Sequence, residues 1–322
     1  MAVTQEQADW FADAFAKLVD NVGLAILGKR EQIALVLTAL LSEGHVLLDD
    51  VAGSGKTVLA KAIAATIEGT SSRIQFTPDL LPTDILGLMI YNQSTTAFEF
   101  HAGPIFASVV LADEINRAGP KTLSALIEVM DEGVVTADGV ARPVGTPFFV
   151  IATRNGAEQG GVYDLSESQL DRFMLRTSLG YPDRETMVGL LMSGESRARS
   201  SLVTPIITSE SVLAMTALAA DVHVDEAIMQ YLADIVIQTR QDSDVSVGVS
   251  TRGALALARA VKTRAIASGR TFVIPADVRD LSVPVLGHRI VLEPAAAFAG
   301  VTGEQVVALA VTRVDEPTYR AS

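Results

Sequence analysis

The 322-residue sequence contains no cysteine, which excludes disulfide bonds and thiolate metal sites. It also lacks long apolar runs: the longest, such as residues 33–41, fall well short of the roughly 20 residues that cross a bilayer. The first ten residues have neither the basic start nor the apolar core of a signal peptide. We therefore expect a cytoplasmic protein with no direct membrane insertion.

Basic residues are also scarce, because 25 Lys and Arg face 38 Asp and Glu and leave a net charge of −13. No run of basic residues interrupts this acidic character. Phosphate backbones are bound by clustered Lys and Arg side chains, so we expect no nucleic-acid partner. The 49% hydrophobic content is ordinary for a folded globular chain of this length.

A phosphate-binding pattern follows the short apolar run 46–48, where a loop with two glycines leads into Lys56 and Thr57. Glycines let backbone N–H groups turn toward phosphates, and the next helix points its positive end at them. Lys56 would reach the β- and γ-phosphates, and the Thr57 hydroxyl would bind Mg²⁺. The predicted nucleotide-binding residues of this loop are Asp50, Val51, Ala52, Gly53, Ser54, Gly55, Lys56, Thr57 and Val58.

A second apolar run, residues 109–112, ends in Asp113 and Glu114. On a buried parallel strand these acids would reach the same nucleotide, with Asp113 beside Mg²⁺ and Glu114 polarising the attacking water. Two acids at a strand end are by themselves more often solvated. Their combination with Lys56 predicts an ATPase with ATP and Mg²⁺ as cofactors.

Three further polar residues are candidates for the nucleotide site, although each also has an ordinary structural explanation. Asn155 ends an apolar strand and is either a turn former or a group that orients the lytic water. Arg172 is either a surface ion-pair partner of Asp171 or Glu167, or an arginine finger for a neighbouring subunit. Arg252 begins a helix, where the helix dipole disfavours a cation unless an anion lies nearby.

The pattern of apolar runs predicts an α/β fold with a parallel sheet between helices, followed by a smaller helical domain. Strands are expected at 46–48, 74–76, 109–112 and 147–152, and helices at 9–27, 31–42, 57–66, 209–220, 225–241, 251–267 and 275–288. A polar stretch at 193–205 suggests a linker. We place the ATPase core at 1–182 and the helical lid at 183–322.

Several collinear blocks of the sequence resemble MoxR-type AAA+ ATPases over nearly the whole chain. The matching blocks are residues 44–51, 74–84, 103–107, 111–118, 169–173, 222–225 and 284–290. The chain departs from the usual pattern at Arg154 and Gly156, at Ala52 and at Thr251, and none of these changes removes a catalytic group. An acid at the first loop position, here Asp50, is common in such proteins.

The resemblance implies roles for the candidates: Asn155 as sensor 1, Arg172 as a finger acting in trans, and Arg252 as sensor 2 on the lid. Segments 88–101 and 134–147 would be the helix-2 insert and the hairpin before sensor 1, both facing the working surface of a ring. In the resulting hypothesis, one subunit supplies the loop, the acids and the sensors, and its neighbour supplies Arg172.

The same resemblance implies a homo-oligomer, expected to be a hexameric ring, with chaperone-like work on protein clients and a von Willebrand factor A domain partner. A chelatase-type AAA+ subunit is one alternative. A slow nucleotide-dependent switch or scaffold is another, although intact Glu114 and Arg172 argue against it.

Overall fold

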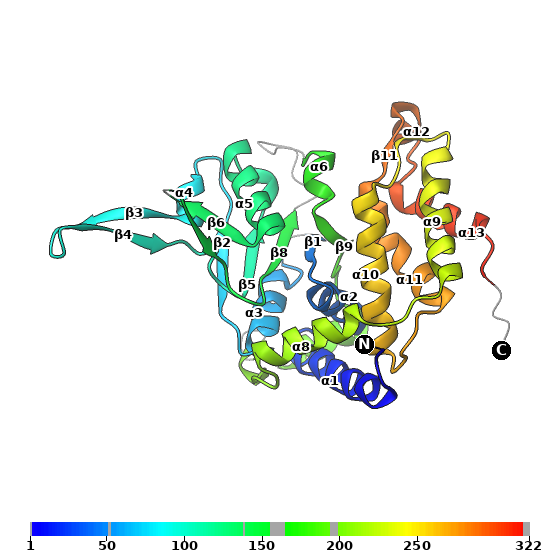
Figure 1. The fold of residues 1–322 in the computed structure, drawn as a ribbon, viewed down its shortest axis with the longest axis horizontal. Coiled ribbons are helices and arrows are strands. Elements are labelled where there is room, and N and C mark those ends of the chain that lie inside the picture. The colour runs from blue at the N-terminus through cyan, green and yellow to red at the C-terminus, as the bar shows by residue number, and fades with distance from the viewer. Residues whose placement is uncertain (1, 51–52, 138, 155–164, 194–198, 318–322) are drawn as a thin grey trace.

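The structure of the chain, a computed structural model, describes residues 2–50, 53–137, 139–154, 165–193 and 199–317 (Figure 1). Its centre is a sheet of five parallel strands, in which the order across the sheet is 71–75, 109–113, 149–154, 45–49 and 173–177. This sheet with its flanking helices confirms the predicted fold class. The strands are β1 (His45–Asp49), β2 (Ser71–Gln75), β5 (Val109–Asp113), β8 (Phe149–Arg154) and β9 (Phe173–Thr177).

Strands β1, β5 and β8 are buried on both faces, as their near-continuous apolar sequences predict, whereas the edge strand β2 is mostly exposed. Successive side chains alternate between faces, so Val46 and Leu48 join one hydrophobic cluster and Leu47 joins the other. The first cluster includes α2 (Arg30–Leu41) and α3 (Lys56–Thr66) together with other helices, and the second includes α4 (Pro82–Leu86) and α5 (Pro120–Glu132), so that helices on both faces of the sheet make three layers.

The first helix, α1 (Gln5–Gly23), begins four residues earlier than the apolar pattern predicts. A capping box explains the difference: Thr4 Oγ1 accepts from Gln7 N at 3.3 Å, and Gln7 Oε1 accepts from Thr4 N at 3.0 Å. The helix also ends before the predicted residue 27. Its buried face, which includes Phe11, Phe15 and Leu18, lies in the first cluster.

Two antiparallel ribbons coincide closely with the segments 88–101 and 134–147 that were predicted to face a working surface. The first pairs β3 (Gly87–Asn92) with β4 (Ala97–Ala102) and projects far from the sheet (Figure 1). The second pairs β6 (Val134–Ala137) with β7 (Val140–Pro143). The ribbons touch where the guanidinium carbon of Arg142 lies 4.2 Å from the Phe100 ring centroid.

The rest of the chain is mostly helical, and α8 and α10 have the predicted bounds. The predicted helix 275–288 ends as an α-helix at residue 286 and continues as a 3-10 helix, η3. The last helix, α13, was not predicted, although Thr302 and Gln305 form a capping box at its start. The elements are η1 (Ile115–Arg117), α6 (Glu167–Leu170), α7 (Arg184–Ser193), η2 (Arg199–Leu202), α8 (Ser209–Ala220), α9 (Glu226–Gln241), β10 (Val245–Val247), α10 (Thr251–Ala267), α11 (Pro275–Leu286), η3 (Gly287–Arg289), β11 (Val291–Leu292), α12 (Pro294–Phe298) and α13 (Gly303–Arg313).

The C-terminal helices share the first hydrophobic cluster with α1, α2 and one face of the sheet. Buried polar contacts cross the same junction, since Ser42 Oγ lies 2.7 Å from Thr263 Oγ1 on α10. The domain boundary between residues 182 and 183 therefore stays a prediction. None of the helices in the described ranges combines the length and apolar character that a membrane span requires.

His45, at the start of β1, ties the sheet to α5. One ring nitrogen accepts from Val150 N at 3.1 Å, and the other lies 3.1 Å from the Met130 carbonyl, to which it donates in the neutral ring. Burial lowers the pKa of His45 to about 4, against a smaller opposing effect of the Met130 hydrogen bond. The native state therefore holds a neutral ring at pH values where the unfolded chain is protonated.

We predict that the free energy of unfolding falls as the pH drops from about 6.5 to about 4, by roughly 3 kcal/mol from His45 alone. Urea unfolding of the wild type and of His45→Gln across this range isolates the effect, because glutamine does not titrate. The difference between the two proteins should shrink as the pH falls. A difference that is independent of pH would contradict the buried neutral ring.

Candidate functional site

The loop between β1 and α3 has the backbone shape of a phosphate cradle. Gly53 and Gly55 have φ angles of +82° and +98°, a region that favours glycine. Lys56 and Thr57 stand in the first turn of α3, which carries no acid. Lys56 Nζ donates to the Asp50 carbonyl at 3.0 Å. Val58 follows in the same turn, and the predicted loop residues Val51 and Ala52 lie outside the described residues.

The acid at the first loop position has a structural role. Asp50 is buried, and its Oδ2 accepts from the backbone N–H groups of Leu179 at 2.7 Å and Gly180 at 3.1 Å. The carboxylate therefore fastens the start of the loop to the segment after β9. This explains why an acid, rather than the usual glycine, stands there.

The hydroxyl of Ser54 indicates whether the loop fits a nucleotide phosphate. Its Oγ is buried, and within the described part of the chain it has no hydrogen-bond partner. A buried hydroxyl without a partner is costly, and a phosphate oxygen would satisfy it. With the two left-handed glycines and the start of α3, the residues present fit a bound nucleotide phosphate.

The two predicted acids lie at the carboxyl end of β5, two strands from β1 in the sheet. Asp113 is buried as the last residue of that strand, and Glu114 turns away with a φ of +59°. Thr153, on the intervening strand β8, holds both: its Oγ1 donates to Asp113 Oδ1 at 2.5 Å and accepts from Glu114 N at 2.9 Å. Thr153 was not predicted, although a hydroxyl inside an apolar strand is a usable signal.

Strand β2 supplies further partners that the sequence reasoning missed. Arg73 Nη2 donates to Asp113 Oδ2 at 2.6 Å, and Gln75 Nε2 donates to Glu114 Oε2 at 3.0 Å. Arg117 Nη1 donates to the same Glu114 oxygen at 3.1 Å. Residues 73 and 75 share one side of a strand because side chains alternate. Both acids are thus held by this chain's own side chains.

The two predicted arginines meet on one carboxylate, Asp131, in the last turn of α5. Arg172 Nε donates to Asp131 Oδ2 at 2.9 Å, and Arg252 Nη1 donates to Asp131 Oδ1 at 3.2 Å. The ordinary alternative of an ion pair with Asp171 or Glu167 was wrong about the partner. The anion expected near Arg252 is, in this structure, a carboxylate.

Sensor position 1 is described only in part. Asn155 lies outside the described residues, whereas Arg154 before it pairs with Asp49 at the end of β1. Arg176 on β9 lies 3.9 Å from the same Asp49 oxygen and also pairs with Glu304 on α13. Charged side chains therefore connect the ends of three neighbouring strands with a C-terminal helix.

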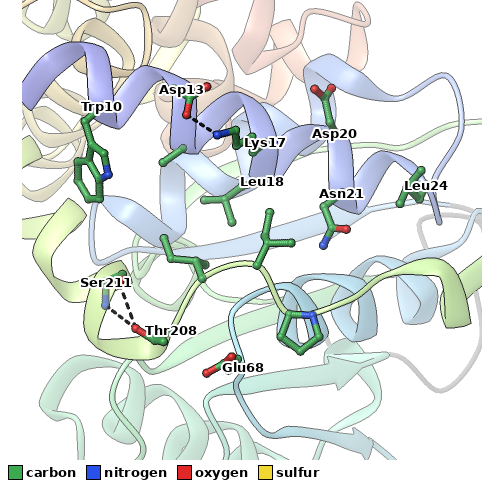
Figure 2. Close-up of a pocket in the computed structure, with 14 residues that line it drawn as sticks. Trp10, Asp13, Lys17, Leu18, Asp20, Asn21, Leu24, Glu68, Thr208 and Ser211 are labelled. Carbon is green, nitrogen blue, oxygen red and sulfur yellow. Dashed lines mark hydrogen bonds and ion pairs between the residues drawn. The ribbon is translucent and has the colours of Figure 1, made fainter.

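A groove of about 740 Å³ lies away from these residues, between α1 and the segment 205–211. Figure 2 shows Trp10 and Leu18 on α1 facing this segment, with Glu68 beside it. Its described lining includes none of the predicted site residues.

Comparison with known proteins agrees with this geometry. Residues 45–175 match the family model described as "ATPase family associated with various cellular activities (AAA)", and residues 237–309 match that of the AAA lid domain. The chain is 38% identical to Chaperone MoxR1 of Mycobacterium tuberculosis, over 95% of this chain and 83% of that one. It is 42% identical to the uncharacterised YeaC protein of Bacillus subtilis, over 95% and 96%.

A crystal structure supports the same relationship. A protein of Cytophaga hutchinsonii, provisionally assigned as an ATPase, superimposes with a TM-score of 0.90 at 34% identity. The match covers 97% of this chain and 98% of that one.

We predict that Asp50→Ala lowers the free energy of unfolding by about 2–3 kcal/mol, because two buried N–H groups lose a charged acceptor. Urea unfolding measures the change. Asp13→Ala is the matched control, since it removes an exposed carboxylate paired with Lys17 and should leave stability unchanged. Equal stability of the two variants would contradict the anchoring role of Asp50.

Proposed function

Since this chain belongs to the MoxR family of AAA+ ATPases, we propose that it hydrolyses Mg-ATP at subunit interfaces of a ring to remodel or mature client proteins. One observation carries the proposal: the Lys56 loop and the Asp113–Glu114 pair leave the same edge of one parallel sheet, with Thr153 fixing the acids between them. Open parallel sheets bind ligands at the carboxyl ends of their strands.

In this proposal the phosphate loop, residues 50–58, holds the nucleotide. Lys56 would bind the β- and γ-phosphates, and Ser54 Oγ would gain a partner. Thr57 and Asp113 would hold Mg²⁺, which supplies charge neutralisation on the phosphate oxygens when bound. Arg73 occupies one Asp113 oxygen, so it must move or share that oxygen when a cation competes for it.

Glu114 would act as the base that orients and polarises water, and Asn155 would act as sensor 1. A carboxylate that already accepts hydrogen bonds from Gln75 and Arg117 is a weaker acceptor for a water proton than one without these donors. Release of Glu114 from these two donors would therefore accompany the active arrangement.

The arginine pair would serve the neighbouring subunit. Because Arg172 and Arg252 of one chain share Asp131, they lie on one face of that chain. The hypothesis from the sequence gave Arg252 to its own subunit's nucleotide; the shared carboxylate favours assigning both arginines to the neighbour. An arginine completing a phosphoryl-transfer site is worth roughly 10³–10⁵ in turnover.

The projecting ribbon β3–β4 is the proposed client-contacting element. One of its faces carries Met89, Tyr91, Phe98 and Phe100 in register. Tyr91 and Phe98 stack edge to face at 5.3 Å, and Phe98 is 67% exposed. Exposed aromatic groups of this kind suit contact with other proteins. The name of the relative Chaperone MoxR1 supports the chaperone-like work in this proposal. The proposal also includes a hexameric ring, a cytoplasmic location, a von Willebrand factor A domain partner and the absence of a nucleic-acid partner.

We predict that Arg172→Ala lowers ATP turnover roughly 10³-fold and that mixing with equally inactive Lys56→Ala subunits restores activity. In mixed rings, Lys56→Ala subunits supply intact arginines to the intact loops of Arg172→Ala subunits. Arg252→Ala should behave in the same way. Phosphate release from Mg-ATP measures each mixture.

A second mixture tests the shared face. Arg172→Ala mixed with Arg252→Ala should stay inactive. Both arginines at an interface would come from one subunit, and every subunit in this mixture lacks one of them. Recovery in that mixture would show that the two arginines serve different sites. Arg279→Ala, which removes an exposed lid arginine paired with Glu316, is the control expected to keep full activity.

A further inference from the structure

Arg289, in η3, is a buried cation that none of the roles above uses. Its side chain is 2% exposed. Nε donates to Asp171 Oδ1 at 2.8 Å, and Nη2 donates to the carbonyls of Asp171 at 3.0 Å and Phe173 at 2.8 Å. Nη1 donates to the carbonyl of Met174 at 3.2 Å and to a carbonyl of α11. These contacts grip the chain on both sides of Arg172.

Each N–H group of the Arg289 guanidinium has a hydrogen-bond acceptor, so the side chain fits only one arrangement of the surrounding backbone. Burial lowers the pKa of Arg289, and Asp171 opposes this by its hydrogen bond and its charge. A buried guanidinium is tolerated only when each N–H group finds a partner in good geometry. Five such donors in a rigid fork fix the position of the backbone that accepts them.

The same carboxylate reaches the helix that carries Arg252. Ser250 Oγ, the N-cap of α10, lies 3.0 and 2.9 Å from the two oxygens of Asp171, and Gly253 N donates to this hydroxyl at 3.0 Å. Arg252 is the second residue of that helix. Asp171 therefore joins the backbone beside Arg172 to the helix start beside Arg252.

Gly253 leaves the space that this arrangement needs. A Cβ atom there would lie 2.7 Å from Arg289 Cδ and 2.9 Å from Val249 Cγ1, closer than real contacts allow. A side chain at this position would displace Arg289 from Asp171 or move the start of α10. The absence of a side chain at Gly253 therefore leaves room for the Arg289 side chain beside the residue that follows Arg252.

We propose that Arg289 is a positioning residue for the arginine pair: through Asp171 it sets Arg172 and Arg252 at the face presented to the neighbouring subunit. This rests on the proposed function of that pair in trans. Substitution of a residue needed only for folding would impair both the face that donates arginines and the face that binds nucleotide. Substitution of Arg289 should impair only the face that donates arginines.

Arg289→Lys keeps the charge but loses the fork, and we expect its ATP turnover to fall about 100-fold because the arginines are misplaced. Its affinity for a fluorescent ATP analogue should stay that of the wild type. Mixing with Lys56→Ala subunits should restore turnover. Mixing with Arg172→Ala subunits should not, because both partners then lack a well-placed donor face.

Arg270→Lys is the matched control. Arg270 forms a similar fork with Asp277, at 2.7 and 2.6 Å, but lies beyond the other end of α10. The Arg270→Lys variant should have a lower melting temperature than the wild type but should keep its ATP turnover without being mixed with another variant. Gly253→Ala should reproduce the Arg289→Lys pattern in both mixtures.

Recovery of Arg289→Lys with Arg172→Ala subunits, or weakened binding of the ATP analogue, would overturn the positioning role. If Arg289→Lys does not fold, Asp171→Asn goes through the same mixtures, because its side chain is 21% exposed. Failure of Arg172→Ala itself to recover with Lys56→Ala would overturn the proposed function. Recovery of that control without recovery of Arg289→Lys would overturn only the inference drawn from Arg289.

Discussion

Burial of the parallel sheet on both faces constrains everything else in this molecule. Helices cover the faces, so the inner strands β1, β5 and β8 are apolar along most of their length, and polar side chains concentrate where these strands end. At the carboxyl edge, β1 leads into the phosphate loop, β5 into the acid pair, and β8 carries Thr153 between them. The position of the proposed site therefore follows from how the core is packed.

Charges at this site are already paired within the chain. Arg73 holds Asp113, Gln75 and Arg117 hold Glu114, and Asp131 holds both arginines. A nucleotide or a neighbouring subunit would meet groups that have partners to exchange. Such an exchange costs less free energy than leaving a charge unpaired in a partly buried site, since the protein groups remain hydrogen-bonded throughout.

The sequence predicted those parts of the fold and site that depend on local pattern. Continuous apolar runs located β1, β5 and β8, but β9 was not expected and β2 begins three residues before the predicted strand 74–76. The loop from Asp50 to Thr57 and the acids at 113 and 114 were proposed from residue type and order. Helix ends were less accurate where a cap decides them, as at Thr4. Asn155, Val51 and Ala52 lie outside the described residues, and the roles of these and of the other site residues stay predictions.

What the sequence did not predict depends on contacts between distant segments. Asp131 stands 41 positions from Arg172 and 121 from Arg252, and nothing in its neighbourhood marks it as their common partner. Arg289 and Asp171 are 118 positions apart. The packing of α10 and η3 against β9 and the segment before it brings Arg289, Asp171 and Arg252 together, and α5 supplies Asp131. Periodicity carries no information about either arrangement.

The central claim is that a neighbouring subunit completes each nucleotide site. The most direct measurement is phosphate release from Mg-ATP over a series of protein concentrations, with Lys56→Ala as the blank and sedimentation reporting assembly. We expect activity per subunit to rise with concentration and to level off as rings form. Undiminished activity per subunit at concentrations where sedimentation shows only monomer would contradict the claim.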